Sequence, residues 1–155
     1  MDFITIEYKT QFPLSLIFNK KSMSKYQVLF RFLFWAKFVE RQLNSVWLAL
    51  LSTKEVQLPY FTPAHLLCQR MISFIKNFVY YLCYEVIEEN WLVFLVNLRR
   101  AKTFEEIIDC HGGFLNNCLK ETLLANGKLL AIITAEVGKA CENFVVMKTF
   151  INNLM

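Results

Sequence analysis

The sequence is short of the residues that build turns, with only 4 glycines and 3 prolines in 155 residues. Sandwiches and barrels join many short strands through turns that depend on these two residue types. Such all-β folds are therefore excluded, and long helices become the expected elements. We predict an all-α fold: an irregular bundle of about five helices, preceded by a short extended segment at the N-terminus.

Charged residues are scarce as well, at 19% of the chain against 55% for hydrophobic residues, and this composition excludes disorder. The longest stretch without Asp, Glu, Lys or Arg is 56–69, and Pro59 and Pro63 interrupt it. It is too short to span a bilayer, so we expect no contact with a membrane. The length is that of one domain, which predicts a single unit over residues 1–155 with an extended lead-in over 1–22.

The net charge of +4 is unevenly distributed. Residues 1–54 hold 8 basic and 3 acidic side chains, whereas residues 55–155 hold 9 and 10. The positive field therefore belongs to the first third of the chain. An excess of this size fits an acidic protein surface at least as well as nucleic acid, whose readers usually cluster far more charge. We do not expect nucleic acid as a partner.

Residues suited to catalysis or metal binding are few. The five cysteines are odd in number and widely spaced, which indicates reduced thiols in a cytosolic protein. Cys110 and His111 are adjacent, but neighbours on a helix point about 100° apart, which argues against a Cys–His dyad. A CxxC or HxxxH pair of metal ligands, a phosphate-binding glycine loop and a GxSxG motif are all missing from the sequence. We expect no enzyme, no cofactor and no metal site.

The first predicted helix has two apolar faces. Ser24 and Gln27 form a capping box at its start, and it runs to about Leu51. Placing residues at 100° steps puts a core stripe on one face: Leu29, Phe32, Ala36, Val39, Leu43, Val46 and Trp47. On the opposite face Phe30, Phe34 and Phe38 form a second, aromatic stripe. Positive charge flanks this stripe at Lys37 and Arg41.

A second long helix should follow. Thr62 and Pro63 are a strong N-cap and first-position pair, and the helix should reach about Ile87. It carries very few charges, which predicts a central helix that is buried nearly all round. The segment from Trp91 to the basic pair at 99–100 either continues this helix or restarts it after a kink.

Two further helical stretches complete the prediction. Thr103 and Glu106 form another capping box, opening a stretch that should bend or break at Gly112 and Gly113 and end near 125. A last helix should run from Lys128 to near the C-terminus.

Three segments resemble one known family. Residues 13–47, PLSLIFNKKSMSKYQVLFRFLFWAKFVERQLNSVW, resemble the C-terminal domain of gamma-tubulin complex components, most closely component 2. The later segments QRMISFIKNFVYYLCYEVIEENW and DCHGGFLNNCLKETLLAN resemble the same domain, in the same order. Together they cover most of the chain, which looks like the distal portion of that domain because family members are several times longer.

The resemblance implies an all-helical module that binds gamma-tubulin and other complex components. It also implies that the module supports microtubule nucleation at microtubule-organising centres of the cytoplasm, such as the centrosome or spindle pole. An alternative is a truncated helical adaptor that binds other complex components and has no affinity for gamma-tubulin.

On this basis we assign candidate protein-binding residues along the first helix. Five of them would steer a partner by charge: Lys20, Lys21, Lys25, Lys37 and Arg41. Phe34 and Phe38 would pack against it as anchors. In the competing interpretation these side chains pack against upstream helices of the same domain, or are core and solubilising residues only.

Overall fold

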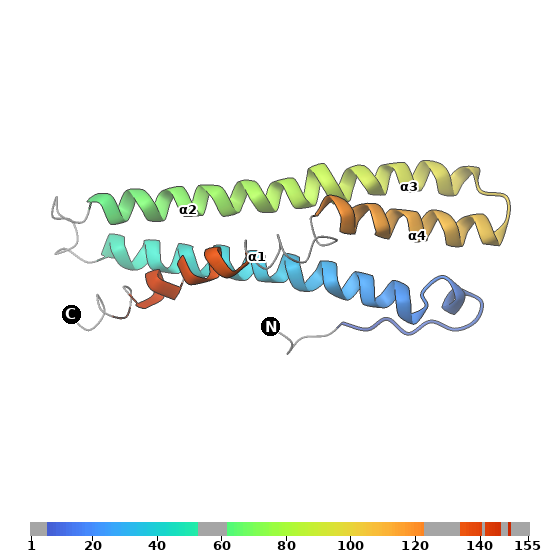
Figure 1. Ribbon diagram of the computed structural model, residues 1–155, viewed down its shortest axis with the longest axis horizontal. Coiled ribbons are helices and arrows are strands. Elements are labelled where there is room, and N and C mark those ends of the chain that lie inside the picture. Colours follow the sequence, from blue (N-terminus) through green and yellow to red (C-terminus); the bar gives the residue numbers. More distant parts are fainter. Residues whose placement is uncertain (1–5, 53–61, 123–133, 141, 147–148, 150–155) are drawn as a thin grey trace. The chain divides into compact units, whose positions relative to one another are not determined.

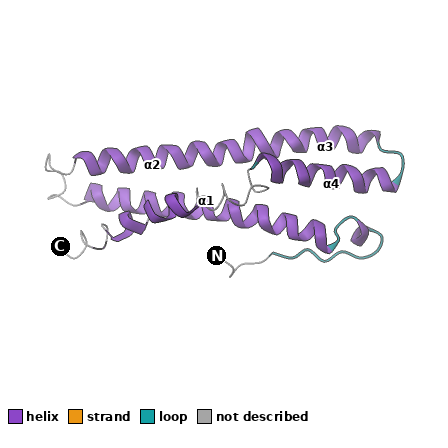
Figure 2. Cartoon of the chain, viewed as in Figure 1, coloured by secondary structure: helices purple, strands orange, loops and turns teal. Residues whose placement is uncertain are grey.

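Helices make up most of the described chain. The computed structural model describes residues 6–52, 62–122, 134–140, 142–146 and 149 (Figure 1). In order, its elements are the 3-10 turn η1 (Leu14–Leu16), helix α1 (Lys20–Ser52), helix α2 (Thr62–Tyr80), the π-helical segment η4 (Tyr81–Glu88), helix α3 (Glu89–Arg100) and helix α4 (Phe104–Glu121). These residues contain no strand (Figure 2), so the prediction of an all-α fold is confirmed.

Part of the predicted last helix is also described. Residues 134–140 and 142–146 are helical, as expected, whereas 128–133 lie outside the described residues.

The chain divides into two compact units. Unit 1 comprises Met1–Phe34 and Tyr80–Leu130, and unit 2 comprises Trp35–Val79 and Ala131–Met155. Each unit combines segments that are far apart in sequence, and α1 contributes to both. Neither unit is therefore a contiguous domain, and the single folding unit over 1–155 stays a prediction.

Helix α1 begins earlier than the sequence indicated. It starts at Lys20, and the Asn19 side-chain oxygen accepts a hydrogen bond from the Ser22 backbone N–H at 2.9 Å. The Ser24 hydroxyl donates to the Lys20 carbonyl at 2.9 Å, which is the bond a serine makes inside a helix. The predicted capping box at Ser24 is therefore wrong, and Asn19 caps the helix instead.

The predicted core stripe of α1 is confirmed. Six of its seven members are buried, and Trp47 packs beside them while partly buried. In unit 2 the stripe meets α2 and the C-terminal helical residues, where Val46, Leu50, Cys68 and Phe144 form one apolar cluster.

Residues 62–100 form one uninterrupted helical run. Helix α2 passes into η4 and then into α3 without a break, so the continuing helix is confirmed over a restart. The side-chain amide of Asn90 donates to the Val86 carbonyl at 2.8 Å and to the Glu121 carboxylate at 2.6 Å. The Val86 carbonyl also accepts from the Glu89 backbone N–H, so Asn90 adds a second donor there and ties the start of α3 to the end of α4.

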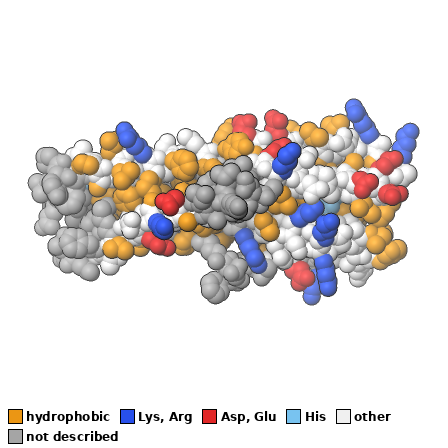
Figure 3. Space-filling model, viewed as in Figure 1, with side chains coloured by type: hydrophobic (Ala, Val, Ile, Leu, Met, Phe, Trp, Pro, Cys, Tyr) orange, Lys and Arg blue, Asp and Glu red, His pale blue; other side chains and the backbone are white. Residues whose placement is uncertain are grey.

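The predicted all-round burial of the second helix is wrong. Within α2 only Cys68, Ile75 and Val79 are buried. Leu67 and Phe74 are 53% and 54% exposed, and apolar side chains reach the surface where α2 lies in the view (Figure 3). A helix buries only the stripe that faces a neighbour, and a low charge count does not supply a second neighbour.

Helix α4 is held by its own cap and by the core of unit 1. The Glu106 backbone N–H donates to the Thr103 hydroxyl at 3.3 Å, and the Glu106 side chain accepts from the Thr103 N–H, confirming the predicted capping box. The same carboxylate also accepts from the Lys102 N–H, and these backbone bonds lower the pKa of Glu106.

The bend predicted at the two glycines of α4 is wrong. The helix runs unbroken from Phe104 to Glu121 through Gly112 and Gly113, and neither glycine has a positive φ. Buried side chains on both sides of the pair, His111 and Leu115, hold the helical backbone in place. Tertiary packing here outweighs the roughly 1 kcal/mol helix penalty of each glycine.

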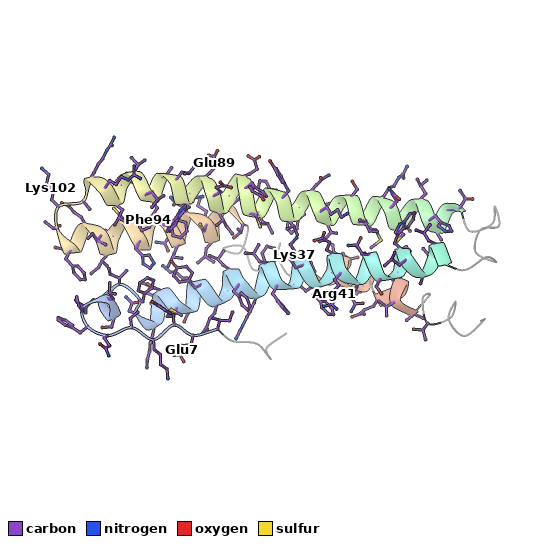
Figure 4. All side chains as sticks on the ribbon, turned by 180° about the vertical axis from the view of Figure 1, so that it is seen from behind. Glu7, Lys37, Arg41, Glu89, Phe94 and Lys102 are labelled. Carbon is purple, nitrogen blue, oxygen red and sulfur yellow. The ribbon has the colours of Figure 1, made fainter. Side chains whose placement is uncertain are left out.

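The core of unit 1 is built around His111, which is only 4% exposed. Aromatic rings surround its imidazole: Phe18 and Phe94 lie edge-on, at 5.3 Å and 6.2 Å between ring centres, and Tyr26 is tilted at 5.7 Å. The Tyr26 hydroxyl lies 3.0 Å from His111 Nε2. Phe94 projects from α3 toward α4 (Figure 4), where its ring also contacts Phe114 at 5.4 Å.

This environment favours uncharged side chains. Burial lowers the pKa of His111, and the positive charge of Lys25 lowers it further. Burial also raises the pKa of the Tyr26 hydroxyl, with a smaller contribution from Cys118. The pKa of the Cys118 thiol is raised to about 11, chiefly by burial, so this cysteine stays a neutral core residue. We infer that neutral His111 is the form that the fold stabilises.

The buried imidazole makes stability depend on pH in a defined direction. The pKa of His111 is lower in the folded than in the unfolded chain, so below about pH 6.5 the unfolded chain takes up a proton first. We expect the free energy of unfolding to fall as pH is lowered from about 7.5 to 5.5, and His111→Gln to remove part of that fall. Urea unfolding followed by circular dichroism measures both.

The second histidine supplies the control for this measurement. His65 lies in unit 2 beside Trp47, at 5.9 Å between ring centres. His65→Gln should retain the pH dependence that His111→Gln loses. Equal pH dependence of the wild type and His111→Gln would contradict the assignment.

Candidate interaction surface

All seven candidate residues lie on α1, and those in unit 1 differ in their surroundings. Lys20 and Lys21 are exposed in the first turn of the helix. Lys25 is partly buried, and its ammonium donates to the Asn116 side-chain oxygen of α4 at 2.6 Å. Lys25 therefore links two helices of unit 1, and only the first two lysines are exposed without a side-chain partner among the described residues.

Phe34 is the aromatic candidate of unit 1. Its side chain is 41% exposed although the residue is apolar. The ring packs on that of Phe30 one turn earlier, with 5.9 Å between centres and an angle of 30° between the planes. This stacking holds the exposed ring in place, so it can receive a partner with little loss of side-chain entropy.

The candidates of unit 2 place an aromatic ring among positive charges. Phe38 is 42% exposed, and Lys37 and Arg41 are exposed on the same helix (Figure 4). The Lys37 ammonium lies 3.0 Å from the Glu40 carboxylate, an ion pair between residues three apart. That pair is solvent-accessible on the lysine side and contributes little to stability. The positive charge of Lys37 is thus partly compensated, whereas Arg41 has no ion-pair partner among the described residues.

Helical periodicity sorts the candidates into two groups. Within unit 2, Phe38 and Arg41 are three residues apart, which puts them on one side of α1. Within unit 1, Lys25 is spaced at four and seven residues from Leu29 and Phe32, which are buried. Unit 2 thus contributes Lys37, Phe38 and Arg41 to the exposed candidates, whereas in unit 1 Phe34 is exposed and Lys25 lies toward the buried stripe.

Sequence reasoning missed further exposed apolar side chains in each unit. In unit 2 they include Leu66 and Phe74 of α2, and in unit 1 they include Trp91 and Leu92 of α3, each between 44% and 56% exposed. The scarcity of charge in this part of the chain was the available signal. Scarcity of charge predicts a buried helix, but it is equally typical of a helix with an exposed apolar face.

The described residues suit binding better than chemistry. They contain no group of three His, Cys, Asp or Glu side chains that could hold a metal ion. His111, expected at a bend, is buried next to Tyr26, while Cys110 is a partly buried free thiol. None of the described helices combines the length and the apolar character that a bilayer crossing requires. What the chain offers is exposed aromatic and basic side chains on a helical scaffold.

Comparison with known proteins places this scaffold in a family. Residues 1–154 match the gamma tubulin complex component C-terminal family. Gamma-tubulin complex component 2 of Mus musculus is 39% identical over 137 residues, which is 86% of this chain and 15% of that protein. The protein of the same name from Arabidopsis thaliana is 38% identical over 80% of this chain and 19% of its own length.

A fungal relative carries a different name. Spindle pole body component alp4 of Schizosaccharomyces pombe is 37% identical over 81% of this chain and 17% of its own length. The chain thus spans less than a fifth of each of these three relatives. The match over nearly all of its residues shows that the chain belongs to the gamma-tubulin complex component family, through the C-terminal domain of that family.

Proposed function

We propose that this chain binds gamma-tubulin through the exposed side of α1 and thereby supports microtubule nucleation within a gamma-tubulin complex. The action is non-catalytic: helices hold the partner in place, and no bond is made or broken. Relatives are named for the gamma-tubulin complex and for the spindle pole body, so we place the chain at a microtubule-organising centre of the cytoplasm. Other components of the complex would be its further partners.

The observation that carries the proposal is the pair of exposed phenylalanines beside positive charge. Phe34 and Phe38 each leave about two fifths of their surface in solvent. An isolated fold gains nothing from this exposure, whereas aromatic side chains are enriched at the centres of protein interfaces. Lys37 and Arg41 flank them and would attract an acidic surface over several ångströms.

Charge and aromatic contact make separable contributions to binding. Charges outside the desolvated centre of an interface mainly raise the association rate, and salt screens that effect. Aromatic anchors mainly slow dissociation. The two parts of the proposed surface can therefore be tested independently by binding kinetics.

The charge part is tested by Lys37→Glu together with Arg41→Glu. We expect this variant to associate with purified gamma-tubulin at least about tenfold more slowly at about 50 mM salt, with the difference shrinking at about 300 mM. Surface plasmon resonance with immobilised gamma-tubulin measures both rates. The matched control, Lys76→Glu with Lys139→Glu, reverses two other exposed charges of unit 2 and should bind as the wild type does.

Unchanged association of the Lys37/Arg41 variant would remove this surface from the proposal. If gamma-tubulin is not bound even by the wild type while the chain still co-sediments with complex components, the adaptor interpretation holds instead.

The aromatic part is tested by Phe34→Ala together with Phe38→Ala. Each ring removed from an interface centre costs about 2 kcal/mol of binding free energy, so dissociation should accelerate by well over tenfold. Because both rings are partly exposed, the free energy of unfolding should change little. Phe104→Ala is the control, since Phe104 is a comparably exposed ring on α4. Equal dissociation rates for the two variants would contradict the proposal.

A further inference from the structure

Unit 1 also has a groove, which shares one residue, Lys20, with the candidate binding residues described above. The N-terminal segment runs beside the start of α1, and between them lies a hollow of about 330 Å³ lined by aromatic and aliphatic side chains, among them Tyr8, Phe18, Tyr26 and Phe30. A second hollow of about 550 Å³ has polar walls that include Lys9, Thr10 and Lys20. Tyr8, Phe18, Met23 and Gln27 line both, so the two hollows form one groove with an apolar half and a polar half.

The apolar half is preformed. Phe18 makes edge contacts with Tyr8 at 5.8 Å and with His111 at 5.3 Å. Tyr26, which also lines this half, lies with its hydroxyl 3.0 Å from the same imidazole. The rings are thus fixed by the core of unit 1, and a ligand entering the groove would not have to order them.

The polar half carries positive charge that the chain itself does not use. Lys9 and Lys20 line it, and only Glu7 opposes them there. Lys21 adds an exposed charge in the first turn of α1, where no acidic residue occurs. Lysines at this end of a helix oppose the helix dipole and slightly destabilise it, so folding does not explain them.

We propose that this groove binds an extended acidic segment of a partner protein, with one large apolar side chain in the aromatic half and carboxylates against Lys9 and Lys20. The apolar half of the groove alone would accept many ligands. The lysines of the polar half favour ligands that carry negative charge. The site goes beyond the gamma-tubulin surface, from which it shares only Lys20, and its test uses no gamma-tubulin.

Three fluorescein-labelled peptides test the proposal on the full chain by fluorescence polarisation. Glu-Glu-Phe-Glu-Glu should bind saturably. Glu-Glu-Ser-Glu-Glu lacks the apolar anchor and Lys-Lys-Phe-Lys-Lys reverses the charge, so each should bind at least about tenfold more weakly. Equal binding of the first two peptides would mean that charge attraction alone holds the peptide, and would contradict a role for the aromatic half of the groove. Equal binding of the first and third would overturn the selection for acidic segments.

Variants of the chain then locate the site. Lys9→Glu with Lys20→Glu should weaken Glu-Glu-Phe-Glu-Glu by at least about tenfold, whereas Lys102→Glu with Lys120→Glu, an equal change of charge elsewhere on unit 1, should leave it within about twofold. Tyr8→Ser should weaken it too, and circular dichroism checks that each variant keeps its helices. If both charge variants lose the same affinity for Glu-Glu-Phe-Glu-Glu, or if neither loses any, the peptide does not bind in this groove.

Discussion

A helix buries only the stripe that faces a neighbour, and this constraint governs both units. Helix α1 is 33 residues long and has apolar side chains on two opposite faces. Its stripe from Leu29 to Leu50 is buried against other helices, while Phe34 and Phe38 remain at the surface. The long helical run from Thr62 to Arg100 shows the same division. With hydrophobic residues at 55% of the chain, much apolar surface is left for partners to cover.

The basic side chains of α1 differ in their exposure and in their partners. Lys25 is hydrogen-bonded to Asn116 of α4 and lowers the pKa of His111 through its charge, so it acts within unit 1. Lys37 is paired with Glu40, whereas Lys20, Lys21 and Arg41 project into solvent. A binding surface on α1 therefore has fewer unpaired basic side chains than the sequence predicted. The exposed rings of Phe34 and Phe38 would contribute correspondingly more of the binding free energy.

Local signals predicted what local interactions decide. Thr103 and Glu106 satisfy each other across one helical turn, and the predicted capping box was confirmed. The start of α1 was misplaced because Asn19 and Ser24 are both good caps, and the sequence does not tell which one the chain uses. The glycine pair of α4 stays helical because His111 packs on Tyr26, 85 residues away. The exposed face of α2 was missed because a scarcity of charge does not distinguish a buried apolar face from an exposed one.

The central claim is that Phe34 and Phe38 contact gamma-tubulin, and hydroxyl-radical footprinting with mass spectrometry tests it most directly. Both rings should be oxidised readily in the chain alone and be protected once gamma-tubulin is bound. Phe104, 39% exposed on α4, should react equally in both states. A complex in which Phe34 and Phe38 remain as reactive as in the free chain would contradict the account.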